Sequence, residues 1–167
     1  ITVEKKLVAL YTLQQIDSKI DKIRIIRGEL PEAVQDLEDE VAGLETRIAN
    51  YNSELEKHNT DITNYKIKIK ETQALIKKYE EQQNNVRISR EYDSLTKETE
   101  YQNLEIQLCE KKIREATIKI EEIKIGLQNT ETKLEELKND LLVKQSELNS
   151  IVEETEKEEE DLALKSK

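Results

Sequence analysis

The side chains best suited to metal or nucleophilic chemistry are one cysteine, Cys109, and one histidine, His58. A closed zinc site needs about four Cys or His ligands, so these two residues cannot form one. Both fall on the repeating positions that face the partner helix in a predicted coiled coil. A buried thiol there usually packs as a small hydrophobic group. We therefore expect both residues to serve packing rather than catalysis.

Carboxylates are abundant, with 37 Asp and Glu among 167 residues and a formal net charge of -10. The sequence contains no Gly-rich phosphate loop, nucleophile elbow or HExxH helix. A catalytic carboxylate pair needs a cleft that shifts its pKa values, and a two-stranded coiled coil offers none. We expect a chain that is not an enzyme. It could also be the appendage of a catalytic domain encoded elsewhere in the gene.

The composition indicates long helices. Hydrophobic residues make up 35% of the chain and charged residues 38%, with 3 Gly and 1 Pro. No apolar run approaches the roughly 20 residues that cross a bilayer, and the N-terminus lacks the layout of a signal peptide. The sequence therefore predicts a cytoplasmic chain without membrane contact. Residues 64–114 carry 11 Lys/Arg and 9 Asp/Glu, or +2, whereas residues 131–161 carry 4 and 12, or -8. This asymmetry favours different partners at the two ends.

Two heptad patterns predict the fold. Steps of three and four alternate on both sides of Val86, but the next seam residue, Ile88, follows after a step of two. The break predicts a turn, and the fold class is all-α: a long, kinked, antiparallel coiled-coil helical hairpin that is monomeric. The predicted seam before the turn consists of Ala9, Leu13, Ile16, Ile20, Ile23, Arg27, Leu30, Val34, Leu37, Val41, Leu44, Ile48, Tyr51, Leu55, His58, Ile62, Tyr65, Ile69, Thr72, Ile76, Tyr79, Gln83 and Val86. After the turn it consists of Ile88, Tyr92, Leu95, Thr99, Gln102, Ile106, Cys109, Ile113, Ala116, Ile120, Ile123, Leu127, Thr130, Leu134, Leu137, Leu141, Lys144, Leu148, Ile151, Thr155, Glu158 and Leu162.

The hairpin spans residues 1–167 and divides into a first helical segment (1–30), the rest of the ascending arm (31–86), a tip (87–91) and a descending arm (92–165). Antiparallel pairing around this tip places residues whose numbers sum to about 174 opposite each other.

Gly28 and Pro31 mark a predicted kink. Proline inside a helix removes a hydrogen bond and costs about 3 kcal/mol or more. The seam keeps its phase across this point, and the two arms are nearly equal in length, so we expect a kink with pairing along the full arms. Alternatively, Gly28 ends one helix and Pro31 opens a second, which folds back.

Three residues are expected to build the tip. Asn85 suits the turn conformations that end a helix, and Ser89 suits the N-cap of the next helix. Tyr92 falls on the seam, so its ring is expected to pack against the Val86 side of the turn. Arg87, Arg90 and Glu91 fall off the seam and are expected to face solvent, where they could bind a partner.

The tip sequence NNVRISREYDSLTKETE, which contains Arg87 and the REY triplet at residues 90–92, resembles a bacterial family of coiled-coil proteins with a C-terminal C4-type zinc ribbon. The segment LYTLQQIDSKIDKI at residues 10–23 and the ELP before the long helix resemble the same family, so the likeness covers essentially the whole chain. It implies a kinked helical hairpin followed by a zinc ribbon with two CxxC motifs. Because this chain has no CxxC, we expect zinc only in a module beyond residue 167.

The resemblance also implies a function. Members of that family look like adaptors that join transcription control to flagellar or secretion machinery, through an alternative sigma factor, RNA or export components. A non-enzymatic adaptor or scaffold with a protein partner is therefore expected, and nucleic acid would be bound through the zinc ribbon. The alternative is a purely structural spacer or tethering arm. A spacer tolerates any turn, whereas an adaptor needs the exposed groups of Arg87, Arg90 and Glu91.

Overall fold

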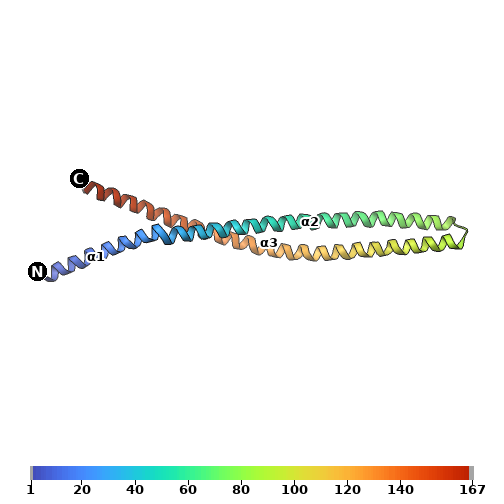
Figure 1. Ribbon diagram of the computed structural model, residues 1–167, viewed down its shortest axis with the longest axis horizontal. Coiled ribbons are helices and arrows are strands. Elements are labelled where there is room, and N and C mark those ends of the chain that lie inside the picture. The colour runs from blue at the N-terminus through green and yellow to red at the C-terminus, as the bar shows by residue number, and fades with distance from the viewer. Residues whose placement is uncertain (1, 166–167) are drawn as a thin grey trace. The chain divides into compact units, whose positions relative to one another are not determined.

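A computed structural model describes residues 2–165, which are helical except at one turn. Helix α1 (Thr2–Arg24) continues through a five-residue π-helical turn, η1 (Ile25–Glu29), into α2 (Leu30–Asn85). After a three-residue turn, α3 (Ser89–Lys165) returns antiparallel to α2 (Figure 1). The described residues include no strand. The predicted all-α helical hairpin is thus confirmed.

The chain forms two compact units. The tip unit (Arg47–Thr130) contains the turn, and the base unit (Ile1–Thr46 and Glu131–Lys167) contains α1 and the last part of α3. Each unit holds a stretch of α2 packed against a stretch of α3, so each is a two-stranded coiled coil in its own right.

The predicted seam forms the core of both units. Every predicted seam residue of α2 from Val34 to Gln83 is buried or half-buried, and so is every one of α3 from Leu95 to Glu158. Cys109 is the most deeply buried of the core residues, at 3% exposure. The side chain of Leu162 lies outside those described. Burial along a single seam is what a heptad repeat produces, because only that face of each helix meets the other.

Side-chain contacts show the antiparallel register, which lies near the predicted sum of 174 in the tip unit and is offset from it in the base unit, where the numbers of the paired α2 and α3 residues sum to 183. In the tip unit, the Lys68 ammonium lies 3.3 Å from the Glu105 carboxylate. The Lys112 ammonium lies 5.6 Å from the centroid of the Tyr65 ring. In the base unit, an ion pair of 3.4 Å joins Lys138 to Glu45. Ion pairs between two helices at a solvent-exposed position contribute little stability, but they favour one register over its neighbours.

The helix runs through Pro31 without a break, and a π-turn accommodates it. Leu30 donates its N–H to the Ile25 carbonyl, five residues earlier. Such a wider turn relieves the clash between a proline ring and the carbonyl four residues before it, here that of Arg27. Gly28 lies inside this turn and has no positive φ, so it does not cap a helix. The distortion lies where the kink was predicted, and no second helix folds back.

The prediction that the seam keeps its phase through this point is wrong. A π-turn inserts one extra residue, which rotates everything before it by about 100° relative to an uninterrupted α-helix. Lys22, Ile25 and Ile26 are accordingly half-buried, whereas the predicted seam residues Ile23 and Arg27 are exposed.

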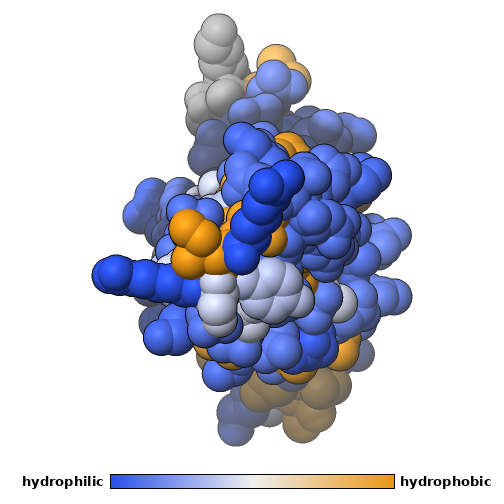
Figure 2. All heavy atoms as spheres, turned by 90° about the vertical axis from the view of Figure 1, so that its right-hand side faces the viewer, coloured by the Kyte–Doolittle hydropathy of each residue, from blue (hydrophilic) through white to orange (hydrophobic). Residues whose placement is uncertain are grey.

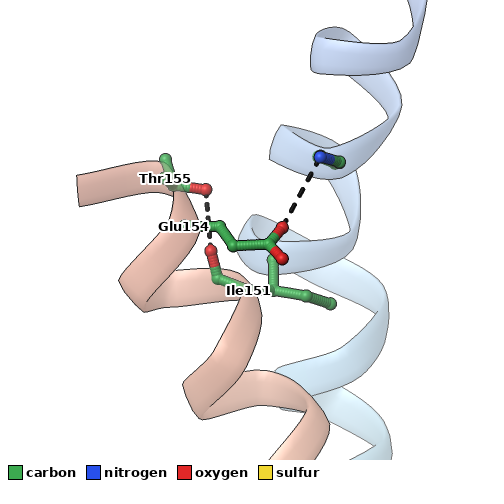
Figure 3. Close-up of polar contacts among 4 residues, drawn as sticks. Ile151, Glu154 and Thr155 are labelled. Carbon is green, nitrogen blue, oxygen red and sulfur yellow. Dashed lines mark hydrogen bonds and ion pairs between the residues drawn. The ribbon is translucent and has the colours of Figure 1, made fainter. Parts of the chain in front are cut away.

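Pairing along the full arms is also wrong, because α1 has no buried residue. Its link to α3 is the ion pair between Lys22 and Glu154, 3.5 Å long, which crosses between the helices in Figure 3. Figure 1 shows α1 and the last turns of α3, both in the base unit, moving apart beyond this contact.

Candidate functional site

The turn between α2 and α3 is shorter than predicted. Helix α2 ends at Asn85 and α3 begins at Ser89, so the turn comprises residues 86–88 rather than the predicted tip of residues 87–91. The Val86 N–H donates to the Gln83 carbonyl at 3.3 Å, which extends α2 by a tighter last turn. No described residue has a positive φ, so Asn85 ends α2 without adopting the left-handed conformation.

Ile88, not Ser89, occupies the N-cap position of α3. Its carbonyl accepts a hydrogen bond from the Tyr92 N–H at 3.2 Å, and Ser89 is already the first helical residue. The predicted N-cap role of Ser89 is therefore wrong by one residue. Glu91 lies in the first turn of α3, where a carboxylate interacts favourably with the helix dipole.

A side-chain clamp that the sequence reasoning missed closes the turn. The Gln83 amide Nε2 donates to the Tyr92 carbonyl at 3.2 Å and to the Thr96 Oγ1 at 2.8 Å. Thr96 Oγ1 in turn donates to the Tyr92 carbonyl at 3.1 Å. Spacing in the sequence places Gln83 on the seam and predicts no further role for it. The signal that could have revealed the clamp is a seam amide three residues before the register break.

The turn exposes two large apolar side chains. Ile88 is 60% exposed and Tyr92 is 50% exposed, although both continue the heptad spacing. Tyr92 is thus exposed although it falls on the seam, and packing of its ring against the Val86 side of the turn stays a prediction. Ile88 lies in the turn itself, where neither helix faces it, whereas Tyr92 lies beside the end of α2, since Gln83 bonds to its backbone carbonyl.

Arginines flank these apolar groups. Arg87, Arg90 and Glu91 are exposed, as predicted from their positions off the seam. Figure 2, which faces the end of the molecule where the turn lies, shows hydrophobic groups in orange at the surface among hydrophilic ones. A shallow open groove adjoins them and is lined by Gln82, Asn85, Val86, Arg90, Glu91, Ser94 and Leu95. We call the exposed set Arg87, Ile88, Arg90 and Tyr92 the tip patch.

The other chemically capable side chains do not assemble into a reactive site. Cys109 is buried. His58 is half-buried and lines a groove together with Tyr65 and Ala116. Within residues 2–165, no group of three or more His, Cys, Asp or Glu side chains is placed to hold a metal ion. The hydrogen bond to Glu105, followed by the charge of that carboxylate, raises the pKa of Lys68 above its ordinary value.

Comparison with known proteins yields no relative. No protein-family model matches the chain, and neither the curated proteins nor the solved structures include a match. Separately, none of the helices described is both long and apolar enough to span a membrane.

Proposed function

We propose that this chain is a non-enzymatic adaptor or scaffold whose tip patch binds a protein partner. The observation that supports this function is the exposure of Ile88 and Tyr92 directly beside two arginines. Aromatic side chains and arginine are enriched in the centres of protein interfaces, because they combine a large apolar area with directed hydrogen bonding.

The clamp that closes the turn uses no side chain of the tip patch, since only the backbone carbonyl of Tyr92 takes part in it. Gln83 and Thr96 hold the two helices together from inside, and the exposed side chains of Arg87 and Ile88 make no contribution to that clamp. A turn needs neither two arginines nor an exposed isoleucine, whereas burial of a large apolar side chain contributes about 1.5–3 kcal/mol to an interface. The clamp also restrains the backbone at Tyr92, and such preorganisation lowers the entropic cost of binding.

The resemblance to the zinc-ribbon coiled-coil family supports a particular class of partner. On that basis the partner is an alternative sigma factor or a component of the flagellar or secretion machinery, in the cytoplasm. Contact with nucleic acid is assigned to a zinc ribbon beyond residue 167. At a net charge of -10, the chain itself repels phosphates over most of its surface.

A purely structural spacer or tethering arm is the second candidate. The clamp of Gln83 favours it, because the turn is closed without any partner. The two functions differ in what they require of the tip patch.

The test replaces Arg87 and Arg90 together with Ala, and Ile88 alone with Ser. Matched controls lie on the outer face of α3: Arg114→Ala, and Ile118→Ser, since Ile118 is 61% exposed and Ile88 is 60%. Circular dichroism should show unchanged helicity and melting for all variants. Titration calorimetry against a purified alternative sigma factor, and against purified export components, measures binding.

We expect both tip variants to weaken binding by at least about tenfold, or about 1.4 kcal/mol. The controls should bind as the unaltered chain does. Equal binding by tip and control variants would assign the turn a structural role only and leave the spacer function.

A further inference from the structure

Helix α1 carries an apolar stripe that its own chain leaves uncovered. Leu13, Ile16, Ile20 and Ile23 are 57%, 49%, 44% and 40% exposed, and with Ala9 they follow the three-four spacing of a coiled-coil seam. A stripe with this period is suited to burial against another helix.

Two features of the base unit keep the stripe from packing on α3. The π-turn rotates α1 so that Lys22, not Ile23, faces Glu154. Beyond that ion pair, the seam residues of α3 whose side chains are described are Thr155 and Glu158, which are polar. None of the described side chains covers the stripe.

The charges beside the stripe indicate the kind of surface that would complement it. Helix α1 contains 5 Lys/Arg and 3 Asp/Glu, a local +2. Lys19 lies three residues after Ile16, and Arg24 lies four residues after Ile20, so both border the stripe. In the same base unit, residues 147–161 of α3 carry 8 Asp/Glu and 1 Lys, a local -7.

We propose that a second copy of this chain covers the stripe. The two α1 helices pack antiparallel with their stripes facing each other, and the cations of each α1 face the acidic end of the other copy's α3. A two-fold dimer needs a self-complementary surface, and the base unit supplies both the basic and the acidic half. The proposed dimer differs from the monomer expected from sequence. Its interface is independent of the tip patch, which lies in the other unit.

Charge reversal tests this arrangement without disturbing the core. Variant X carries Lys19→Glu and Arg24→Glu, and variant Y carries Glu156→Lys and Glu159→Lys; all four residues are exposed. At residues 19, 24, 156 and 159, all four side chains are acidic in X and all four are basic in Y. Each variant should repel itself, whereas X and Y should attract each other at both contacts.

Sedimentation equilibrium of the full 167-residue chain measures the masses from about 1 μM to about 1 mM. We expect a dimer for the unaltered chain, self-association weakened by at least about tenfold for X and for Y alone, and a restored dimer when they are mixed. Ile16→Glu should also abolish the dimer, while the matched control Ile118→Glu should not.

Several outcomes overturn the proposal. A monomer throughout the concentration range removes the second copy as occupant. A dimer that Ile16→Glu leaves intact places the interface elsewhere, and failure of mixed X and Y to associate refutes the pairing of α1 with α3. Circular dichroism confirms that each variant keeps its helicity, so that unfolding does not imitate dissociation.

Discussion

Replacing Gly126 with Ala tests the packing of the tip unit. Gly126 lies on α3 directly against Tyr51 of α2. A Cβ at residue 126 would lie 2.9 Å from the Tyr51 hydroxyl oxygen and 3.1 Å from its Cζ. The ring is not loose, because Arg47 Nε donates to the hydroxyl at 3.2 Å and the guanidinium carbon lies 5.6 Å from the ring centroid. The added methyl group therefore forces the ring away from α3.

Two opposing effects set the magnitude. Alanine in place of glycine stabilises a helix interior by about 1 kcal/mol, and overpacking costs about 1–3 kcal/mol. We expect a net loss of about 0–2 kcal/mol in the free energy of unfolding. Gly43 is the matched control, because no neighbouring atom lies within 4 Å of where its Cβ would be. Gly43→Ala should gain about 1 kcal/mol, which raises Tm by about 2–4 °C in a chain of this size.

Urea denaturation followed by circular dichroism measures both variants and a double-mutant cycle with Tyr51→Ala. Once the ring is removed, Gly126→Ala should change sign and stabilise by about 1 kcal/mol, giving a coupling energy of about 1–3 kcal/mol between the two residues. If Gly126→Ala stabilises the unaltered chain as much as Gly43→Ala does, the steric reasoning fails.

Three further predictions concern other contacts. The buried Thr99 hydroxyl has no hydrogen-bond partner, so Thr99→Val should stabilise the fold by about 1 kcal/mol. Thr72→Val should not stabilise it, because it removes a 2.7 Å hydrogen bond to the Lys68 carbonyl. Denaturation that finds Thr72→Val the more stable variant contradicts this prediction. Glu105→Gln should lower the pKa of Lys68 in an NMR titration. Because the pKa of Lys68 is raised in the folded chain, the stability that this ion pair contributes is fully present below the ordinary lysine pKa and is lost as the pH rises through the raised pKa. A Lys68 titration that Glu105→Gln leaves unshifted would disprove the pairing. Pro31→Ala should let an α-helical bond replace the π-turn, stabilise by up to about 3 kcal/mol and slow amide exchange at residues 25–31; unchanged exchange would show that proline does not cause the π-turn.

The heptad pattern was sufficient to predict the seam, because a period near 3.5 residues determines which face of each helix is buried. It correctly placed residues as different as Cys109 and Thr130 at the interface, at 3% and 6% exposure. The turn was located by the step of two after Val86, which no continuous coiled coil allows. These features depend only on spacing, which the sequence states directly.

The errors arise where spacing is not enough. By its spacing in the sequence, the stripe of α1 continues the seam, but one extra residue in η1 rotates it away from α3. The spacing alone does not distinguish a kink from a π-turn. At the turn, the exact end of α2 decides which residues lie between the helices, and Ile88 lies there. That end depends on the Val86 and Gln83 hydrogen bonds rather than on periodicity.

The Gln83 clamp has a consequence for how the chain folds. It joins residues only 13 apart, whereas the Gln145 to Glu38 hydrogen bond in the base unit joins residues 107 apart. Closing the short loop loses less chain entropy, so the hairpin should nucleate at the turn and zip toward the base. During synthesis, α2 is unpaired until the part of α3 beyond Thr96 has emerged from the ribosome. Substitutions near Gln83 should then slow folding, whereas those in the base unit should mainly speed unfolding.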